Sequence, residues 1–257
     1  MTFRRFTIAI ALSVLGLYLL LVASLVSFLD SERLATALVS ERVLFSIMLS
    51  IKAALIATVL AIIVAVPAAY ALSRYDFRGK ALVDTLLELP LIVTPVAMGA
   101  MVLIFFNTRL GEGIQRNIWQ FVFEFSGIVL AQFLTTVGLA IRTIRNTFDE
   151  ISPRFEAVAC TLGATPAQAL MTITLPMARR GILAAMVITF AKCIGEFGAT
   201  IMVAGAMPMK SETMPISIFM RLGSADIAGM AMMILILLAA GLSVLFMLKF
   251  VLKKRYD

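Results

Sequence analysis

A lysine and a glutamate stand four residues apart in an apolar stretch of this sequence, at Lys192 and Glu196. On a helix the two side chains would share one face, where a cation and a carboxylate can neutralise each other or serve an ion or proton pathway. An unpaired charge inside a membrane span costs about 3 kcal/mol or more. We therefore expect Lys192 and Glu196 to pair with each other, pair with another helix, or face water. A structural pair and a direct transport role both stay open.

A second group of polar residues lies in the segment 142–181, which is more polar than the sequence on either side of it. Ser152, followed by a proline, is suited to cap a helix over 154–162. Gly163 can end that helix in the left-handed conformation, which residues with a side chain resist. The small residues along this stretch would let the backbone of a partner come close.

A second short helix follows this turn. Thr165 can cap it and Pro166 suits its first position, so we expect a helix over 167–174 that Pro176 ends. Glu156 can form a charge-assisted bond to a basic group of a partner. Short helices held by turns between membrane helices can transmit rigid-body movement, so the segment predicts a docking surface. Its candidate contact residues are Glu156, Ala157, Ala159, Leu162, Gly163, Ala164, Thr165, Pro166, Ile173, Leu175 and Pro176.

The elements that hold these residues are predicted to be membrane helices. The chain has 257 residues, of which 61% are hydrophobic and 14% charged, and its mean hydropathy is +1.03. These values exclude a soluble domain of this length. We expect an all-α membrane protein with a single transmembrane domain over 1–257. Six segments are long and apolar enough to span a bilayer, at 7–29, 47–73, 86–106, 121–141, 182–206 and 227–251.

The distribution of basic residues predicts the orientation of these six spans. The side that carries both termini and the 142–181 segment has more basic residues than the opposite side. We therefore expect both termini to be cytoplasmic. The basic residues assigned to the cytoplasmic side are Arg4, Arg5, Arg74, Arg78, Lys80, Arg142, Arg145, Arg154, Arg179, Arg180, Lys249, Lys253, Lys254 and Arg255. Those assigned to the outside are Arg33, Arg42, Arg109, Arg116, Lys210 and Arg221.

Two prolines near the start of the third predicted span indicate a kinked or broken helix. Pro90 and Pro95 lie five residues apart, with Thr94 before the second. Each proline removes a backbone donor and clashes with the preceding turn. Inside a membrane such a break is tolerated only where protein or a wet cavity meets the freed carbonyl groups. A bend for packing and a place in a transport pathway are both open interpretations.

The 155–176 sequence resembles the cytoplasmic loop signature of ABC importer permeases. The resemblance rests on an acidic residue and small residues, then Leu162-Gly163-Ala164, then Ile173-x-Leu175-Pro176 with nine residues between Gly163 and Ile173. It implies a type I importer permease fold whose loop forms a coupling helix on an ATP-hydrolysing partner subunit. One departure is that the commonest glutamate position of the pattern, six residues before the glycine, is held by Ala157.

A second resemblance narrows the family. The string Gly195-Glu196-Phe197-Gly198-Ala199-Thr200 is similar to the fifth helix of molybdate and tungstate permeases, with sulfate permeases as the nearest relatives. The resemblance implies import of a tetrahedral oxyanion by a homodimer, with two ATPase subunits beneath it and a substrate-binding protein outside. The implied pathway or gate residues are Pro90, Thr94, Pro95, Lys192, Gly195, Glu196, Gly198 and Thr200.

Several other functions are disfavoured by what the sequence lacks. There is no phosphate-binding glycine loop, so we expect no ATP hydrolysis by this chain, and ATP and Mg should bind the partner subunit. With no histidine and two separated cysteines, a metal site is not expected. The net charge of +7 is explained by loops facing anionic lipid, without nucleic acid. The alternatives kept are a sulfate or thiosulfate permease and a stand-alone ion-coupled transporter. Molybdate, tungstate and sulfate have the same shape and charge, so the sequence does not separate them.

Overall fold

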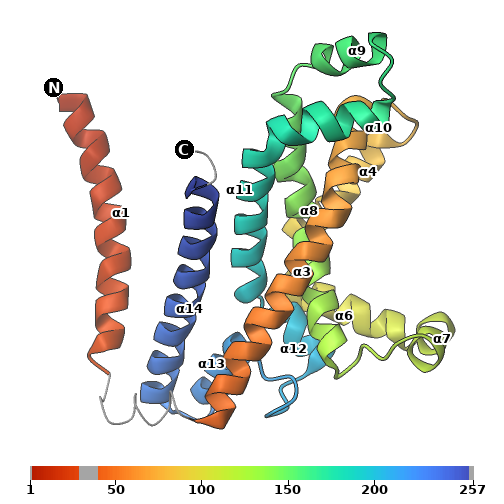
Figure 1. The fold of residues 1–257 in the computed structure, drawn as a ribbon. Coiled ribbons are helices and arrows are strands. Elements are labelled where there is room, and N and C mark those ends of the chain that lie inside the picture. The colour runs from red at the N-terminus through yellow and green to blue at the C-terminus, as the bar shows by residue number, and fades with distance from the viewer. Residues whose placement is uncertain (1, 29–39, 255–257) are drawn as a thin grey trace.

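The computed structural model describes residues 2–28 and 40–254, and every regular element in these two ranges is a helix. Position 29 of the first predicted span and the basic residues Arg33 and Arg255 lie outside the described residues. Most helices run along a common direction, and α9 (Arg154–Thr161) lies across one end of the bundle (Figure 1). We call this end the α9 end.

Within residues 2–28 and 40–254, five helical stretches are long and apolar enough to cross a membrane. Four correspond closely to predicted spans: α1 (Thr2–Val26), α3 (Glu41–Arg74), α8 (Phe125–Asp149) and α14 (Ile227–Lys254). The 34 residues of α3 rise about 51 Å at 1.5 Å per residue, so this helix projects beyond a bilayer core of about 30 Å. The fifth stretch, Pro166–Ile194, begins well before the predicted 182–206 span.

The third predicted span, 86–106, is not one membrane helix. The chain forms α4 (Lys80–Leu87), α5 (Leu89–Ile92) and, after a break at Val93 and Thr94, α6 (Pro95–Phe106). The two prolines stand in the first turns of α5 and α6, where the missing N–H costs no helical hydrogen bond. The predicted break is therefore confirmed, and no single helix long enough to cross a membrane covers residues 86–106.

The fifth predicted span is also broken. The helix α11 (Leu175–Ile194) ends at Gly195, residues Glu196 and Phe197 are not helical, and α12 (Gly198–Ala204) follows. Before α11, the short helix α10 (Pro166–Ala169) continues through a π-helical turn, η1 (Leu170–Thr174), into α11 without interruption.

Alanine residues bring α3 close to α8 and α11 in the centre of the bundle. Alanines at every fourth position from 53 to 69 are fully buried on one face of α3. A stripe of small residues at this spacing lets helix backbones approach closely in a membrane, where van der Waals packing replaces the hydrophobic effect. Buried Ile144 and Phe148 of α8 and Ala185 of α11 pack into the same cluster as the α9-end half of the stripe.

The remaining helices complete the two ends of the bundle. α7 (Arg109–Asn117) and α13 (Met214–Gly223) lie at the end opposite α9 (Figure 1). The first residues of α1 and the last of α14 lie at the α9 end, so the two ends of the described chain and the predicted coupling loop share one side of the bundle. This arrangement agrees with the predicted relation of the termini to the loop.

Candidate functional site

The predicted coupling loop folds as a helix, a glycine turn and a second helix. The first helix, α9, ends one residue before the predicted end, and Gly163 follows with φ of 94°, the left-handed conformation predicted for it. Thr165 and Gln168 form a capping box on α10, since each side chain bonds the other residue's backbone N–H. The expected cap by Ser152 is wrong, because α9 has no side-chain cap and Pro153 occupies that position.

One face of α9 presents apolar side chains that no described residue covers. Phe155, Val158 and Leu162 are all exposed, Leu162 to 84%. Their spacing of three and four residues places them on one side of the helix. The other predicted contact residues divide by exposure: Ala157, Gly163, Thr165, Pro166 and Pro176 are exposed, and Ala159, Ala164, Ile173 and Leu175 are half-buried.

Glu156 turns inward from this helix instead of facing a partner, which corrects the predicted contact. Its carboxylate accepts hydrogen bonds from the Tyr70 hydroxyl at 2.7 Å and the Thr174 hydroxyl at 2.7 Å. It also forms an ion pair with the Arg74 guanidinium, with Nε 2.9 Å from Oε1. The sequence showed the acidic residue but not its partner, which lies on α3, 82 residues earlier in the chain.

The contacts of Glu156 set its protonation. Burial alone would raise the pKa of this carboxyl, but hydrogen bonds from Thr174, Tyr70 and Arg74 and the charge of Arg74 hold the pKa below its ordinary value of 4.5. Glu156 is therefore an anion near neutral pH. It fastens α9 to the end of α3 and to the π-helical turn.

The second half of the loop continues into a membrane helix. Pro176 was expected to end the helix, and this expectation is wrong, since Pro176 lies in the first turn of α11. The physical reason is the π-helical turn directly before it, in which the N–H of Leu175 bonds the carbonyl of Leu170, five residues back. The wider turn changes the carbonyl spacing at the point where a proline ring would otherwise clash.

A chain of polar contacts runs from Glu156 to a cavity on the side of α8. Arg74, which pairs with Glu156, also donates from Nη1 to the Ser73 hydroxyl at 3.1 Å. Ser73 in turn donates to Asp149, and Asp149 pairs with Arg145, their Oδ2 and Nε atoms 3.6 Å apart. These side chains form a continuous series of hydrogen bonds and ion pairs from α9 to α8.

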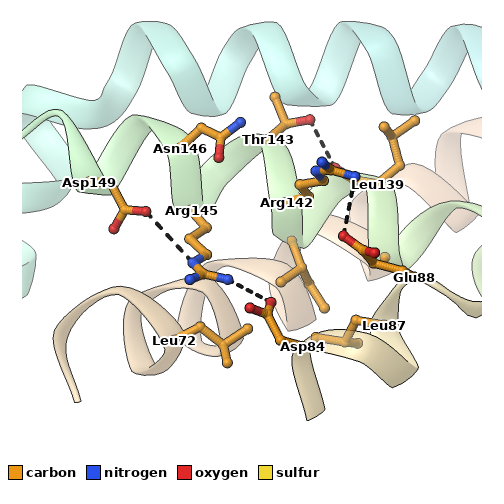
Figure 2. Close-up of a pocket in the computed structure, with 12 residues that line it drawn as sticks. Leu72, Asp84, Leu87, Glu88, Leu139, Arg142, Thr143, Arg145, Asn146 and Asp149 are labelled. Carbon is orange, nitrogen blue, oxygen red and sulfur yellow. Dashed lines mark hydrogen bonds and ion pairs between the residues drawn. The ribbon is translucent and has the colours of Figure 1, made fainter. Parts of the chain in front are cut away.

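The cavity has a volume of about 590 Å³ and lies between α8 and the α4–α5 segment, near the α9 end. Arg145 forms a second ion pair, with Asp84 of α4. Arg142, one turn earlier on α8, pairs with Glu88, with Nη1 3.3 Å from Oε1 (Figure 2). We call Arg142, Arg145, Asp84 and Glu88 the cavity ion pairs.

The cavity ion pairs were not among the predicted site residues. The sequence contains a signal for them, since the two acids are four residues apart and the two arginines three apart. The two acids can therefore share one helical face, and the two arginines can share another. The two faces meet only because α4 and α5 pack along α8. This tertiary contact cannot be predicted from the spacing alone.

The predicted residues of the broken third span and of the fifth span meet at one contact. Thr94 caps α6 by accepting from the N–H of Ala97 at 3.3 Å. A Cβ on Gly198 would lie 2.9 Å from Val96 Cγ2 and 3.1 Å from Pro95 Cβ, so the start of α12 packs directly on the start of α6. The absence of a side chain at Gly198 therefore allows the two helices to approach closely. Gly195 is exposed and mediates no close packing of this kind.

Lys192 and Glu196 do not pair with each other in the described structure, so the first of the three arrangements expected for them is excluded. Because the helix ends at Gly195, the two residues do not share a continuous helical face: Lys192 is exposed and Glu196 is buried. The Glu196 carboxylate instead accepts a hydrogen bond from the N–H of Ala199 at 3.0 Å, in the first turn of α12. Thr200 is fully buried, and its hydroxyl has no hydrogen-bond partner among the described residues.

Known proteins share both the sequence and the fold. A family described as "Binding-protein-dependent transport system inner membrane component" matches residues 57–255. A probable molybdenum ABC transporter permease protein of Haloferax volcanii is 34% identical, over 85% of this chain and 79% of its own. The molybdenum transport system permease protein ModB of Escherichia coli is 36% identical, over 59% of this chain and 67% of its own. The sulfate transport system permease protein CysT of Escherichia coli is 31% identical, over 69% of this chain and 65% of its own.

Solved structures share the arrangement of helices. A bacterial ABC transporter involved in the import of the acidic polysaccharide alginate has a chain that superposes with a TM-score of 0.77 at 18% identity, over 97% of this chain and 93% of that chain. A chain of a bacterial alginate ABC transporter in complex with an alginate pentasaccharide-bound periplasmic protein superposes with a TM-score of 0.71 at 15% identity. This match covers 86% of this chain and 82% of that chain. At these identities the likeness concerns the fold.

The long apolar helices, the broken helices and the loop across one end define a helical, multi-pass membrane protein. The chain belongs to the family of binding-protein-dependent transport system inner membrane components, the permease subunits of ABC importers. It is a transport component and not an enzyme. This membership excludes the stand-alone ion-coupled transporter that Lys192 and Glu196 had left open.

Proposed function

We propose that this permease imports a tetrahedral oxyanion, with molybdate or tungstate as its cargo. The observation that carries the proposal is its likeness to molybdenum permeases from an archaeon and from a bacterium, at 34% and 36% identity. Sulfate is the second candidate, supported by the 31% identity to a sulfate permease. These three dianions share shape and charge, so a separate binding protein would supply most of the discrimination.

The proposed assembly contains two copies of this chain, two ATPase subunits at the α9 end and a binding protein at the opposite end, with ATP and Mg held by the ATPase. The uncovered apolar face of α9 supports the ATPase position, because exposed Phe155, Val158 and Leu162 on a water-facing helix are typical of a protein contact. The inward anchoring of Glu156 would make α9 a firm part of the subunit.

Transport and retention experiments identify the cargo. The cognate binding protein is purified and its retained oxyanion is determined. The complex in proteoliposomes is then tested for ATP-dependent uptake of molybdate, tungstate and sulfate. We expect retention and uptake of molybdate or tungstate. Uptake of sulfate with neither of the others would favour the second candidate, and uptake of none would refute oxyanion import.

The docking role of α9 is tested by charge on its exposed face. Leu162→Asp should leave the permease folded but prevent the ATPase subunit from co-purifying, because a carboxylate would be buried unpaired in the contact. Leu110→Asp is the matched control, since Leu110 is a similarly exposed leucine on α7 at the opposite end. Equal recovery of the ATPase with both variants would refute the assignment.

The proposed orientation places the α9 end in the cytoplasm and both termini with it. Single cysteines at exposed Ser152 and Ser224 probe the two ends, in a Cys160→Ser background that leaves only the buried Cys193. In intact cells an impermeant thiol reagent should label Ser224→Cys and spare Ser152→Cys. The reverse pattern, or labelling of both, would refute the orientation.

A further inference from the structure

The two arginines of the cavity ion pairs form one wall of the cavity, with carboxylates on the opposite wall. Arg142 and Arg145 both project from α8, and Figure 2 shows them directed at Glu88 and Asp84 across the cavity. A guanidinium presents a planar fork of N–H donors that fits a carboxylate and a tetrahedral oxyanion in the same way. Each carboxylate therefore occupies a position beside its arginine that an oxygen of an inorganic dianion could take.

The charge of the cavity depends on these two carboxylates. With Asp149, which also contacts Arg145, the five charged side chains carry a net charge of −1 and would repel an anion. Without Asp84 and Glu88, the remaining three carry +1. Together, Asp84 and Glu88 supply the same charge as one molybdate or sulfate dianion, so exchanging one for the other leaves the arginines neutralised.

The α4–α5 segment is held to α8 in a way that permits such an exchange. No residue of α4 is buried. Its backbone touches α8 closely at Gly138, where a Cβ would collide with the carbonyl oxygen of Leu87. On α8, Arg142 and Arg145 lie one and two turns beyond this contact, towards the α9 end. A rotation of α4 about the contact would carry Asp84, one turn before Leu87, away from Arg145. Glu88 directly follows Leu87 and its side chain is half exposed, so a change of rotamer would release it from Arg142.

We propose that Arg142 and Arg145 form a binding site for a tetrahedral oxyanion, which Asp84 and Glu88 fill in this conformation and which the anion takes when they withdraw. The proposal deepens the proposed function and rests on it for the identity of the cargo. Arg145 stays oriented during the exchange because Asp149 is itself held by Ser73. Ser73 also accepts a hydrogen bond from Arg74, which pairs with Glu156, so these residues connect the site to α9.

The test measures protection of a reporter cysteine in the cavity. Asn146 lines the cavity and is exposed, so Asn146→Cys in a Cys160→Ser background reacts with a hydrophilic thiol reagent. The full-length protein is placed in phosphatidylcholine discs, which carry no net charge, and labelled with sodium molybdate, sodium sulfate or sodium chloride at equal ionic strength. A parallel sample uses discs that also contain anionic phosphatidylglycerol, with sodium chloride alone. In the reporter combined with Asp84→Asn and Glu88→Gln, we expect molybdate or sulfate to slow labelling about tenfold, and chloride to have no effect.

Removing the arginines should abolish that protection. Arg142→Gln and Arg145→Gln, added to the same reporter, should make the labelling rate independent of oxyanion, whereas Arg78→Gln should leave protection intact. Arg78 is the matched control because it is an exposed arginine in the loop before α4. Each variant is compared with wild type by size-exclusion profile and thermal stability, so that misfolding is separated from loss of binding. Single Glu88→Gln, with a smaller gain in protection, serves where the double variant is unstable.

Three results would overturn the proposal: no protection in the carboxylate-neutralised reporter, protection that persists without both arginines, or protection by anionic lipid in the discs but not by soluble oxyanion. The last result would assign the arginines to lipid phosphate. The labelling assay needs neither ATP nor transport. Protection without oxyanion uptake by the complex would refute the proposed function and keep the site, whereas uptake without protection would refute the site alone.

Discussion

The ion pair between Glu156 and Arg74 should be the strongest single interaction between α9 and the membrane helices. Arg74 is 7% exposed at its side chain, and Glu156→Ala would leave its charge buried without the carboxylate. Removing one partner of a buried pair costs about 3–5 kcal/mol. Because Arg74 keeps hydrogen bonds to the carbonyl of Ile151 and to Ser73, we expect the free energy of unfolding to fall by about 3 kcal/mol.

A loss of this size is measurable in detergent. With about 2–4 °C of Tm per kcal/mol for a chain of this size, Glu156→Ala should lower Tm by roughly 6–12 °C. The control is Glu112→Ala, which breaks the exposed pair with Arg116 on α7 and should cost at most about 1 kcal/mol. The double variant Glu156→Gln with Arg74→Met should be more stable than the sum of the two single losses predicts. A Tm for Glu156→Ala equal to that of the control, or strictly additive losses in the double variant, would refute the reasoning.

Three further predictions concern packing, the glycine turn and pH. Gly138→Ala should lower Tm by more than Gly241→Ala, because the first methyl group meets the Leu87 carbonyl and the second meets open space. Gly163→Val should cost about 1–2 kcal/mol through its left-handed backbone alone and reduce ATPase co-purification, while Gly163→Asn should be milder. Because the pKa of Glu156 is lowered by folding, the Tm advantage of wild type over Glu156→Gln should be full above pH 4.5 and disappear as pH falls through the lowered pKa.

Features set by the local backbone could be predicted from the sequence. Gly163, Thr165 and the break between α5 and α6 follow from the conformational limits of glycine, threonine and proline, which act within a few residues. The long α3 follows from an unbroken apolar run. In each case the deciding interaction lies within one or two turns of the residue concerned.

Features set by distant contacts could not be predicted in the same way. Glu156 was identified, but its direction was wrong because Arg74 and Tyr70 reach it from α3. The helix through Pro176 depends on a π-helical turn, which leaves no pattern in the apolar periodicity. The sequence left the partners of Lys192 and Glu196 open, and the end of α11 at Gly195, between them, excludes the arrangement in which they share one helical face.

The uninterrupted path from α10 through η1 into α11 has a mechanical consequence. The path is continuous but not straight, because α10 lies across the α9 end of the bundle and α11 then turns to run along it (Figure 1). Two helical arms joined at an angle without a break act as a lever. A subunit that shifts the α10 arm would therefore tilt α11 and move its Gly195 end at the far side of the bend.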